Sequence, residues 1–260
     1  INARLIQLKT HTILPYCKIN ARLPPLNLQG HTGKTFVNTR ALSYNSRMNK
    51  PDFDKIMQKQ IEALGGRKAK LLIHSCCAPC SSACLERLKD YFDITVLYYN
   101  PNIEEEEYYK RKEEQIRLLR ETGWADIADC DHEGEKFYRT VEGMEDLPEG
   151  GARCLKCFEL RLERTAAEAK YGGFEFFTTT LTISPLKPAA AINAIGERLG
   201  EKYGVAWLHS DFKKRGGYLR SCQLASEHSL YRQNYCGCEF SRKAREKAEE
   251  LKNKVTSGNG

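Results

Sequence analysis

The chain has 260 residues, 41% of them hydrophobic, which is enough for one large domain or two small ones with a buried core. No run of about 18 apolar residues occurs, so we expect no membrane span. Eleven cysteines, an odd number, argue against a simple disulfide scaffold. No secretory signal pattern opens the chain, so we expect the reducing cytoplasm, where paired thiols usually serve metal or redox chemistry.

The net charge of +7 belongs to the first 47 residues. Residues 1–47 hold seven Lys or Arg and no acid, which leaves 34 basic and 34 acidic residues from Met48 onward. This segment shows no sustained helical or strand period. We therefore expect a disordered basic extension over residues 1–47, with a transit-type segment or an RNA-binding arm as alternatives. Residues 48–260 should form a single α/β domain.

From residue 48 onward, helical patterns alternate with short apolar strands. We expect helices over 51–64, 81–92, 103–123, 154–173 and 188–204, and strands over 70–74, 94–100, 125–130, 174–182 and 205–210. This alternation predicts a doubly wound, mainly parallel sheet of about five strands. The segment 216–250 has the pattern of helix, loop and helix, and we expect it to cap the rim of the sheet.

Unusual residues follow the expected strands. In doubly wound sheets, ligands bind beyond the carboxyl ends of the strands. The residues that should meet at this rim are His74–Cys80, Asn100–Asn102, Cys130–His132, Thr178–Ser184 and His209–Lys214. His74 itself is either a donor to a ligand residue or a hydrogen-bonded packing residue, and the sequence leaves both readings open.

Two thiol pairs supply enough ligands for a metal site. Cys76 and Cys77 are adjacent at the end of the first expected strand. Cys154 and Cys157 are three residues apart near a helix start, where they share one face and where the helix dipole favours thiolates. The four thiolates would complete a shell for zinc or for an iron–sulfur cluster. Adjacent cysteines are less typical of structural zinc.

The other candidates are less specific. Cys236 and Cys238 flank a glycine that permits a tight bend. Cys80 is open between a ligand, a redox partner and a thiol at a helix start. Asp211 is either a helix-capping residue or an acid at the rim. We interpret three thiols as buried and inert: Cys84, Cys130 and Cys222. Several basic and aromatic residues could hold a nucleotide or its phosphates: Lys213, Lys214, Arg215, Tyr218, Tyr231, Arg232 and Tyr235.

The set of motifs resembles the epoxyqueuosine reductase QueH family. The resemblance runs from about Lys70 to Ser241 and rests, in order, on HSCCAPCSS, YYNPNI, RCLKCFELRL, TTTLTISPLK, DFKKRGGYLRS and SLYRQNYCGCEFS. It implies a tRNA-modifying oxidoreductase that reduces epoxyqueuosine to queuosine, the last step of queuosine biosynthesis. It also implies a fold like the adenine-nucleotide alpha-hydrolase (HUP) group. Residues 1–47 lie outside the resemblance.

The same resemblance implies roles for single residues. Four thiolates would ligate a [4Fe–4S] cluster: Cys76, Cys77, Cys154 and Cys157. Cys236 and Cys238 would form a redox-active pair, with spacing that allows a disulfide. A second, mononuclear iron would lie next to the cluster, with ligands left unassigned, and could polarise the epoxide oxygen. Asp211 is our candidate for delivering a proton. The substrate tRNA is one expected partner and an unidentified electron donor another, with no membrane partner.

Two other functions stay open on the residues alone. An ATP-dependent tRNA-modifying enzyme would share the fold, but such enzymes carry a Gly/Ser-rich pyrophosphate loop where this chain has HSCCAPC. A zinc-stabilised RNA-binding module would use the same thiols without redox chemistry. Colour distinguishes the iron–sulfur enzyme from the zinc module, because an iron–sulfur protein purified without air is brown and a zinc protein is colourless.

Overall fold

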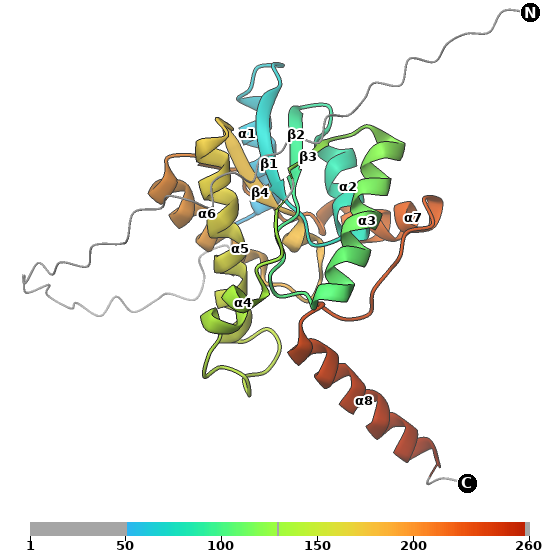
Figure 1. Cartoon of the computed structure of the whole chain (residues 1–260). Helices are drawn as coiled ribbons and strands as arrows, with labels where there is room; N and C mark the ends of the chain where they lie inside the picture. Colours follow the sequence, from blue (N-terminus) through green and yellow to red (C-terminus); the bar gives the residue numbers. More distant parts are fainter. Residues whose placement is uncertain (1–50, 129, 258–260) are drawn as a thin grey trace, which may run out of the picture.

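A five-stranded parallel sheet lies at the centre of the described residues, 51–128 and 130–257 of a computed structural model (Figure 1). Its strands are β1 (Ala69–His74), β2 (Phe92–Leu97), β3 (Asp126–Ala128), β4 (Phe176–Thr179) and β5 (Ala206–Trp207). The spatial order is β3-β2-β1-β4-β5, and every neighbouring pair is parallel. The predicted doubly wound α/β class is therefore confirmed. The extension expected over residues 1–47 lies outside the described residues.

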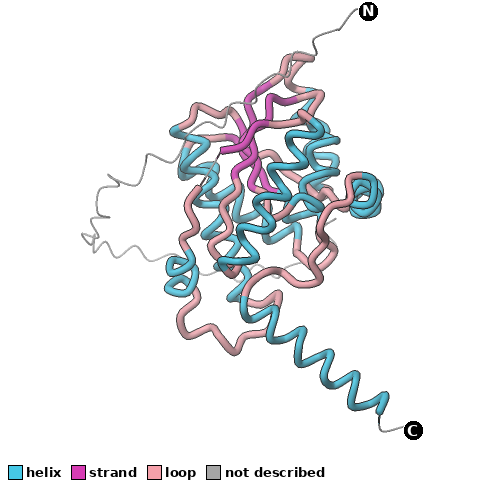
Figure 2. The backbone as a smooth tube through the Cα atoms, turned by 45° about the vertical axis from the view of Figure 1, so that its right-hand side comes forward, coloured by secondary structure: helices cyan, strands magenta, loops and turns pink. Residues whose placement is uncertain are grey.

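Helices cover both faces of this sheet (Figure 2). They are α1 (Phe53–Glu62), α2 (Ala78–Leu88), α3 (Glu105–Thr122), α4 (Gly134–Thr140), α5 (Ala152–Tyr171), α6 (Ala189–Tyr203), α7 (Gly217–Glu227) and α8 (Glu239–Ser257). In β1, Leu71 and Ile73 pack in one core with residues of α1, α2, α3 and α7, whereas Leu72 packs in a second core with residues of α5 and α6. This alternation is the two-residue period of a strand buried on both faces.

Several helix boundaries differ from the sequence prediction for local reasons. α2 begins at Ala78 instead of residue 81, because Pro79 fits the first turn and Cys77 serves as N-cap. It ends at Leu88, because Phe92 begins β2. The short helix α4 was not expected. By contrast, α3 ends before Gly123 as predicted, with that glycine in the left-handed region at φ 62°.

The C-terminal segment folds as the predicted helix, loop and helix, and its two helices make different contacts with the body. α7 packs against α2. The start of α8 is tied to the body, because Arg242 pairs with Glu104 and Tyr138 donates a hydrogen bond to Glu239. The rest of α8 projects away from the body (Figure 1). The loop 230–238 and the first turns of α8 therefore form the part of this segment that borders the sheet rim.

Within the described residues, no helix combines the length and the apolar character that crossing a membrane requires.

Candidate metal centre and active site

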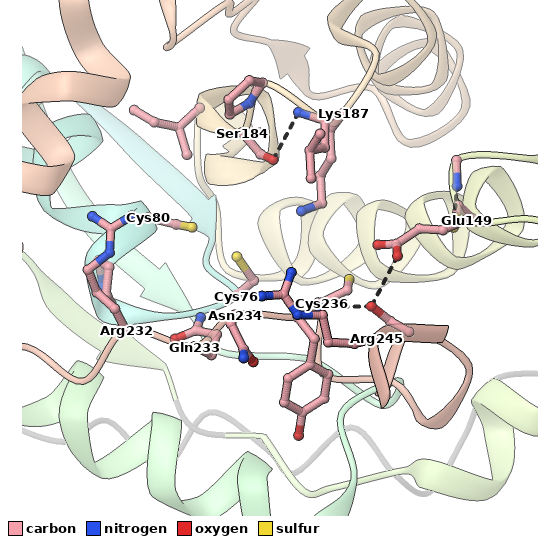
Figure 3. Close-up of a pocket in the computed structure, with 18 of the residues that line it drawn as sticks. Cys76, Cys80, Glu149, Ser184, Lys187, Arg232, Gln233, Asn234, Cys236 and Arg245 are labelled. Atoms are coloured by element: carbon pink, nitrogen blue, oxygen red, sulfur yellow. Dashed lines mark hydrogen bonds between the residues drawn. The ribbon is translucent and has the colours of Figure 1, made fainter. Parts of the chain in front are cut away.

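A cavity of about 610 Å³ lies beyond the carboxyl ends of β1 and β4 (Figure 3). It is lined by Cys76 and Cys80 after β1, by residues 183–187 between η1 (Thr180–Ile183) and α6, and by the beginning of α5. The loop 232–236 and the first turns of α8 complete the wall. The chain thus brings segments from four parts of its length to the rim where the sequence places its unusual residues.

Three sulfur atoms from one short segment meet at this cavity. The Sγ atoms of Cys76, Cys77 and Cys80 all lie within 4.8 Å of one another. Cys77 has extended backbone before α2 begins, and Cys80 follows within the first turn, which returns its thiol to the pair. The thiols of Cys77 and Cys80 hold the pKa of Cys76 well below its ordinary value by hydrogen bonding to its sulfur, despite burial. Cys80, left open by the sequence, therefore belongs to a group that can bind a metal ion.

The second thiol pair comes from the beginning of α5. Cys154 lines the cavity, and its sulfur accepts the N–H of Gly150 at 3.2 Å. Cys157 is buried one turn later in a cluster with Cys238, and burial raises its pKa to about 11. Among the described residues, the group of three or more thiols that meet at metal-ligand spacing is Cys76, Cys77 and Cys80, which does not include Cys154 or Cys157. The four-cysteine ligand set therefore stays a prediction, although three of its members and Cys80 reach one site.

The two thiols of the third pair, Cys236 and Cys238, differ in burial and in acidity. Cys236 lines the cavity, whereas Cys238 is buried behind it. Hydrogen bonding from the Cys238 thiol lowers the pKa of Cys236 to about 5, against the effect of burial, and the same contact raises the pKa of Cys238. Gly237 between them has a φ of 108°, which favours glycine. None of the ten cysteines in the described part forms a disulfide, so the expected redox disulfide stays a prediction.

Cations dominate the charged lining of the cavity. Five basic residues and one acid, Glu149, line it; the basic ones are Arg111, Arg161, Lys187, Arg232 and Arg245. Arg161 and Lys187 were missed in the sequence. A signal for Arg161 was available, because it lies four residues after Cys157 and so shares its helix face. Lys187 ends the motif TTTLTISPLK, but it lies in a turn, so no helical or strand spacing relates it to the cysteines.

Asp211 is nearly buried, and its carboxylate pairs with the Lys213 amine at 2.6 Å. It is not among the residues that line the cavity. The structure therefore places this acid at the same edge of the sheet but in an ion pair of its own. Its predicted role as proton donor stays a prediction.

His74 is a hydrogen-bonded packing residue. Its Nε2 donates to the carbonyl of Tyr99 at 3.1 Å, so Nδ1 accepts from the Thr179 hydroxyl at 2.9 Å. These bonds tie the end of β1 to the ends of both neighbouring strands. Burial lowers the pKa of His74 to about 3, so the ring is neutral at ordinary pH. Of the two readings that the sequence left open, the packing one agrees with this geometry.

The predicted nucleotide-contacting residues separate into two groups. Tyr218, Arg232 and Tyr235 line the cavity. The others are engaged elsewhere or lie outside the lining: the Tyr231 hydroxyl donates to Glu107, and Arg215 pairs with Asp54. The first group gives the cavity mouth an aromatic and cationic character.

Comparisons with known proteins agree with these motifs. The family model described as epoxyqueuosine reductase QueH matches residues 71–244. A protein of Staphylococcus epidermidis with that name is 39% identical over 202 residues, which cover 74% of this chain and 85% of the relative. A protein of the same name from Staphylococcus aureus is 37% identical, over 79% of this chain and 90% of the relative. One from Haemophilus influenzae is also 37% identical, over 82% of this chain and 88% of the relative. The chain belongs to the epoxyqueuosine reductase QueH family.

Proposed function

We propose that this chain is an oxidoreductase that reduces epoxyqueuosine in tRNA to queuosine. The observation that carries the proposal is the convergence of the family's separate thiol motifs on one cavity at the carboxyl end of the sheet. The reaction breaks both C–O bonds of the epoxide, forms a C=C bond and releases water. It therefore needs two electrons and two protons. We place it in a reducing compartment such as the cytoplasm, since it depends on free thiols.

The soft thiols at this cavity support an iron–sulfur cluster as the cofactor. Soft thiolates are the ligands of such clusters, and Cys76, Cys77, Cys154 and Cys157 would hold one here. The cluster and its thiolates are together anionic, and the buried Arg161 offers a guanidinium nitrogen that has no hydrogen-bond partner. When bound, the cluster supplies one-electron transfer. Cys80, next to Cys76 and Cys77 but outside the four-ligand set, is the candidate thiolate for an adjacent single iron.

Oxidation of the Cys236/Cys238 dithiol can supply the electrons and protons that the reaction needs. When a dithiol closes to a disulfide it releases two electrons and two protons, which equals the demand of one epoxide. Cys236 faces the cavity as the more acidic thiol, and Cys238 behind it retains its proton. The external donor would then reduce the disulfide for the next turnover. The asymmetry of burial supports a front thiol and a resolving thiol.

The cavity mouth supports an RNA substrate. Arg232 and Arg245 are exposed there, and Tyr218 is 42% exposed. Arginines of this kind contact phosphates, while an aromatic ring offers a surface on which an unstacked base can lie. A nucleoside that is turned out of the tRNA could therefore enter between them and reach the thiols.

Activity of the anaerobic protein on tRNA that contains epoxyqueuosine tests the proposal. We expect Cys238→Ser to abolish formation of queuosine while iron and sulfide stay near wild-type content, because Cys238 relays electrons without holding the cluster. Cys222→Ser is the matched control, since Cys222 lies in α7 outside the cavity lining. A wild-type protein that binds iron and sulfide but leaves the epoxide intact with every reductant would overturn the function, and a colourless zinc protein would favour the RNA-binding module.

A further inference from the structure

Two buried or partly buried cations at the cavity have no carboxylate partner. Arg161 is 1% exposed; its Nε donates to the Cys157 carbonyl at 3.3 Å, and one terminal nitrogen has no hydrogen-bond partner. Lys187 is partly buried, and its side chain extends toward the sulfur atoms of Cys76 and Cys236 (Figure 3). Within the described residues, no Asp or Glu forms an ion pair with either cation.

The other two buried arginines of the described residues have partners, although one terminal nitrogen of Arg111 has none. Arg111 pairs with Glu107 at 2.6 Å. Arg153 donates to the carbonyls of Met144 and Glu145 and stacks on Phe240. A buried charge without a partner destabilises a fold, because desolvation is not offset by an attraction. Arg161 and Lys187 have no carboxylate partner, so the groups that offset their charge are the thiols of the cavity and whatever those thiols bind.

The surroundings indicate which anion this is. Burial alone would lower the pKa of Lys187, but the nearby thiols of Cys236, Cys76 and Cys80 raise it overall. An RNA phosphate would be met by the exposed Arg232 and Arg245, whereas Arg161 is buried. An iron–sulfur cluster held by the thiolates would bring net negative charge beside both cations, because Arg161 lies one turn after Cys157 in α5 and Lys187 extends toward the Cys76 sulfur. The cluster is therefore the better partner.

We propose that Arg161 and Lys187 are positioning residues that stabilise the reduced form of the cluster and so raise its reduction potential. The inference rests on the proposed function. One-electron reduction adds one negative charge to the cluster, and fixed cations in a poorly solvated cavity favour that added charge. The two residues approach from different elements, α5 and the turn before α6, so the cluster would lie between charges that the fold holds in place.

The midpoint potential of the full-length protein, purified and titrated without air, tests this proposal. We expect Lys187→Gln to shift the one-electron reduction equilibrium about tenfold toward the oxidised form, which is about 59 mV downward. Lys187→Arg keeps the charge and should stay within twofold of wild type. Lys156→Gln is the control, because Lys156 is also in α5 but is exposed and pairs with Glu159. Arg161→Gln should shift the potential in the same direction.

The outcomes distinguish a failure of this inference from a failure of the proposed function. If Arg161→Gln does not fold, the Lys187 series decides alone. An unchanged potential in Lys187→Gln overturns the inference and leaves the proposed function standing. If that variant instead binds unmodified tRNA more weakly and with a shallower salt dependence, Lys187 serves an RNA phosphate and the inference is wrong. A wild-type protein that holds no iron and sulfide overturns both.

Discussion

The two ends of the same sheet carry cavities of similar size and different chemistry. The cavity at the amino ends of the strands, about 710 Å³, is lined by lysines and aspartates of β1, β2 and their neighbours, with no cysteine among its lining residues. The cavity at the carboxyl ends, about 610 Å³, has four cysteines and five cations in its lining. The larger volume therefore does not identify the site. The site is identified instead by its reactive thiols and by its cations that lack a carboxylate partner.

Chain direction explains this difference. In a parallel sheet every strand ends at the same edge, and each following helix begins there with unpaired N–H groups and a positive dipole end. α2 follows β1 within four residues, so Cys76 and Cys80 lie near its beginning. Cys154 lies in the first turn of α5. Helix C-termini gather at the opposite end and offer thiolates no such help. The carboxyl end is therefore the end where thiolates and anions are stabilised.

The largest contrast should come from the thiols themselves. We expect Cys76→Ser to remove most of the bound iron and sulfide and to lower reductase activity more than a hundredfold, because the hydroxyl is a poor substitute for a soft thiolate. Iron and sulfide assays with activity on epoxyqueuosine tRNA measure this. Cys77→Ser, Cys154→Ser and Cys157→Ser should behave alike, and full cluster content in any one of them would remove that residue from the ligand set.

The pH dependence of stability gives a second contrast. The pKa of His74 is about 3 in the folded state and about 6.5 when unfolded, so protons bind the unfolded chain first as the pH falls. Stability contributed by neutral His74 is complete above pH 6.5 and is lost progressively toward pH 3. We expect metal-free protein to lose about 2 kcal/mol of unfolding free energy between pH 6.5 and 5. Urea titrations across this range measure the slope.

His74→Gln serves as the comparison for that experiment. The variant should start less stable but have a flatter dependence between pH 6.5 and 5, because glutamine does not titrate. Equal slopes in wild type and His74→Gln would show that other groups cause the acid sensitivity.

A smaller effect is expected at Asp211. Its carboxylate pairs with Lys213 and lies outside the cavity lining, so we expect Asp211→Asn to change kcat less than threefold. Proton delivery from this residue, the role assigned from the sequence, instead predicts a loss of a hundredfold or more together with an altered pH profile of kcat. Steady-state kinetics at several pH values decide between the two.

The smallest effect should come from the amino end of the sheet. Lys70 and Asp93 are exposed register partners on β1 and β2 and line the cavity there. Lys70→Ala should leave iron, sulfide and kcat unchanged and should alter stability by less than about 1 kcal/mol, the range of a cross-strand pair. A loss of tRNA binding in this variant would show that the substrate contacts both ends of the sheet.

The sequence predicted the parts of the fold that depend on local pattern. Apolar runs and helical spacing yielded the strand order along the chain and the rim where His74 to Cys80 lie. The grouping of Cys80 with Cys76 and Cys77 depended on where α2 begins, and the prediction started that helix three residues late. The positions of Arg161 and Lys187 depended on how α5 and the turn before α6 pack across the cavity. Such contacts join distant segments, and no periodicity records them.

The glycine between Cys236 and Cys238 limits how this thiol pair can be adjusted. A Cβ atom at Gly237 would lie 2.9 Å from Nη1 of Arg111 and 3.0 Å from Cγ1 of Ile103, and its φ of 108° disfavours any side chain. The intervening position therefore cannot be varied to change the acidity or potential of the two thiols. The pKa of Cys236 is lowered first by the Cys238 thiol and, beyond the motif, by the amine of Lys187 and the guanidinium of Arg161. For the redox pair that we propose, part of the thiol acidity is thus set by residues outside the three-residue motif.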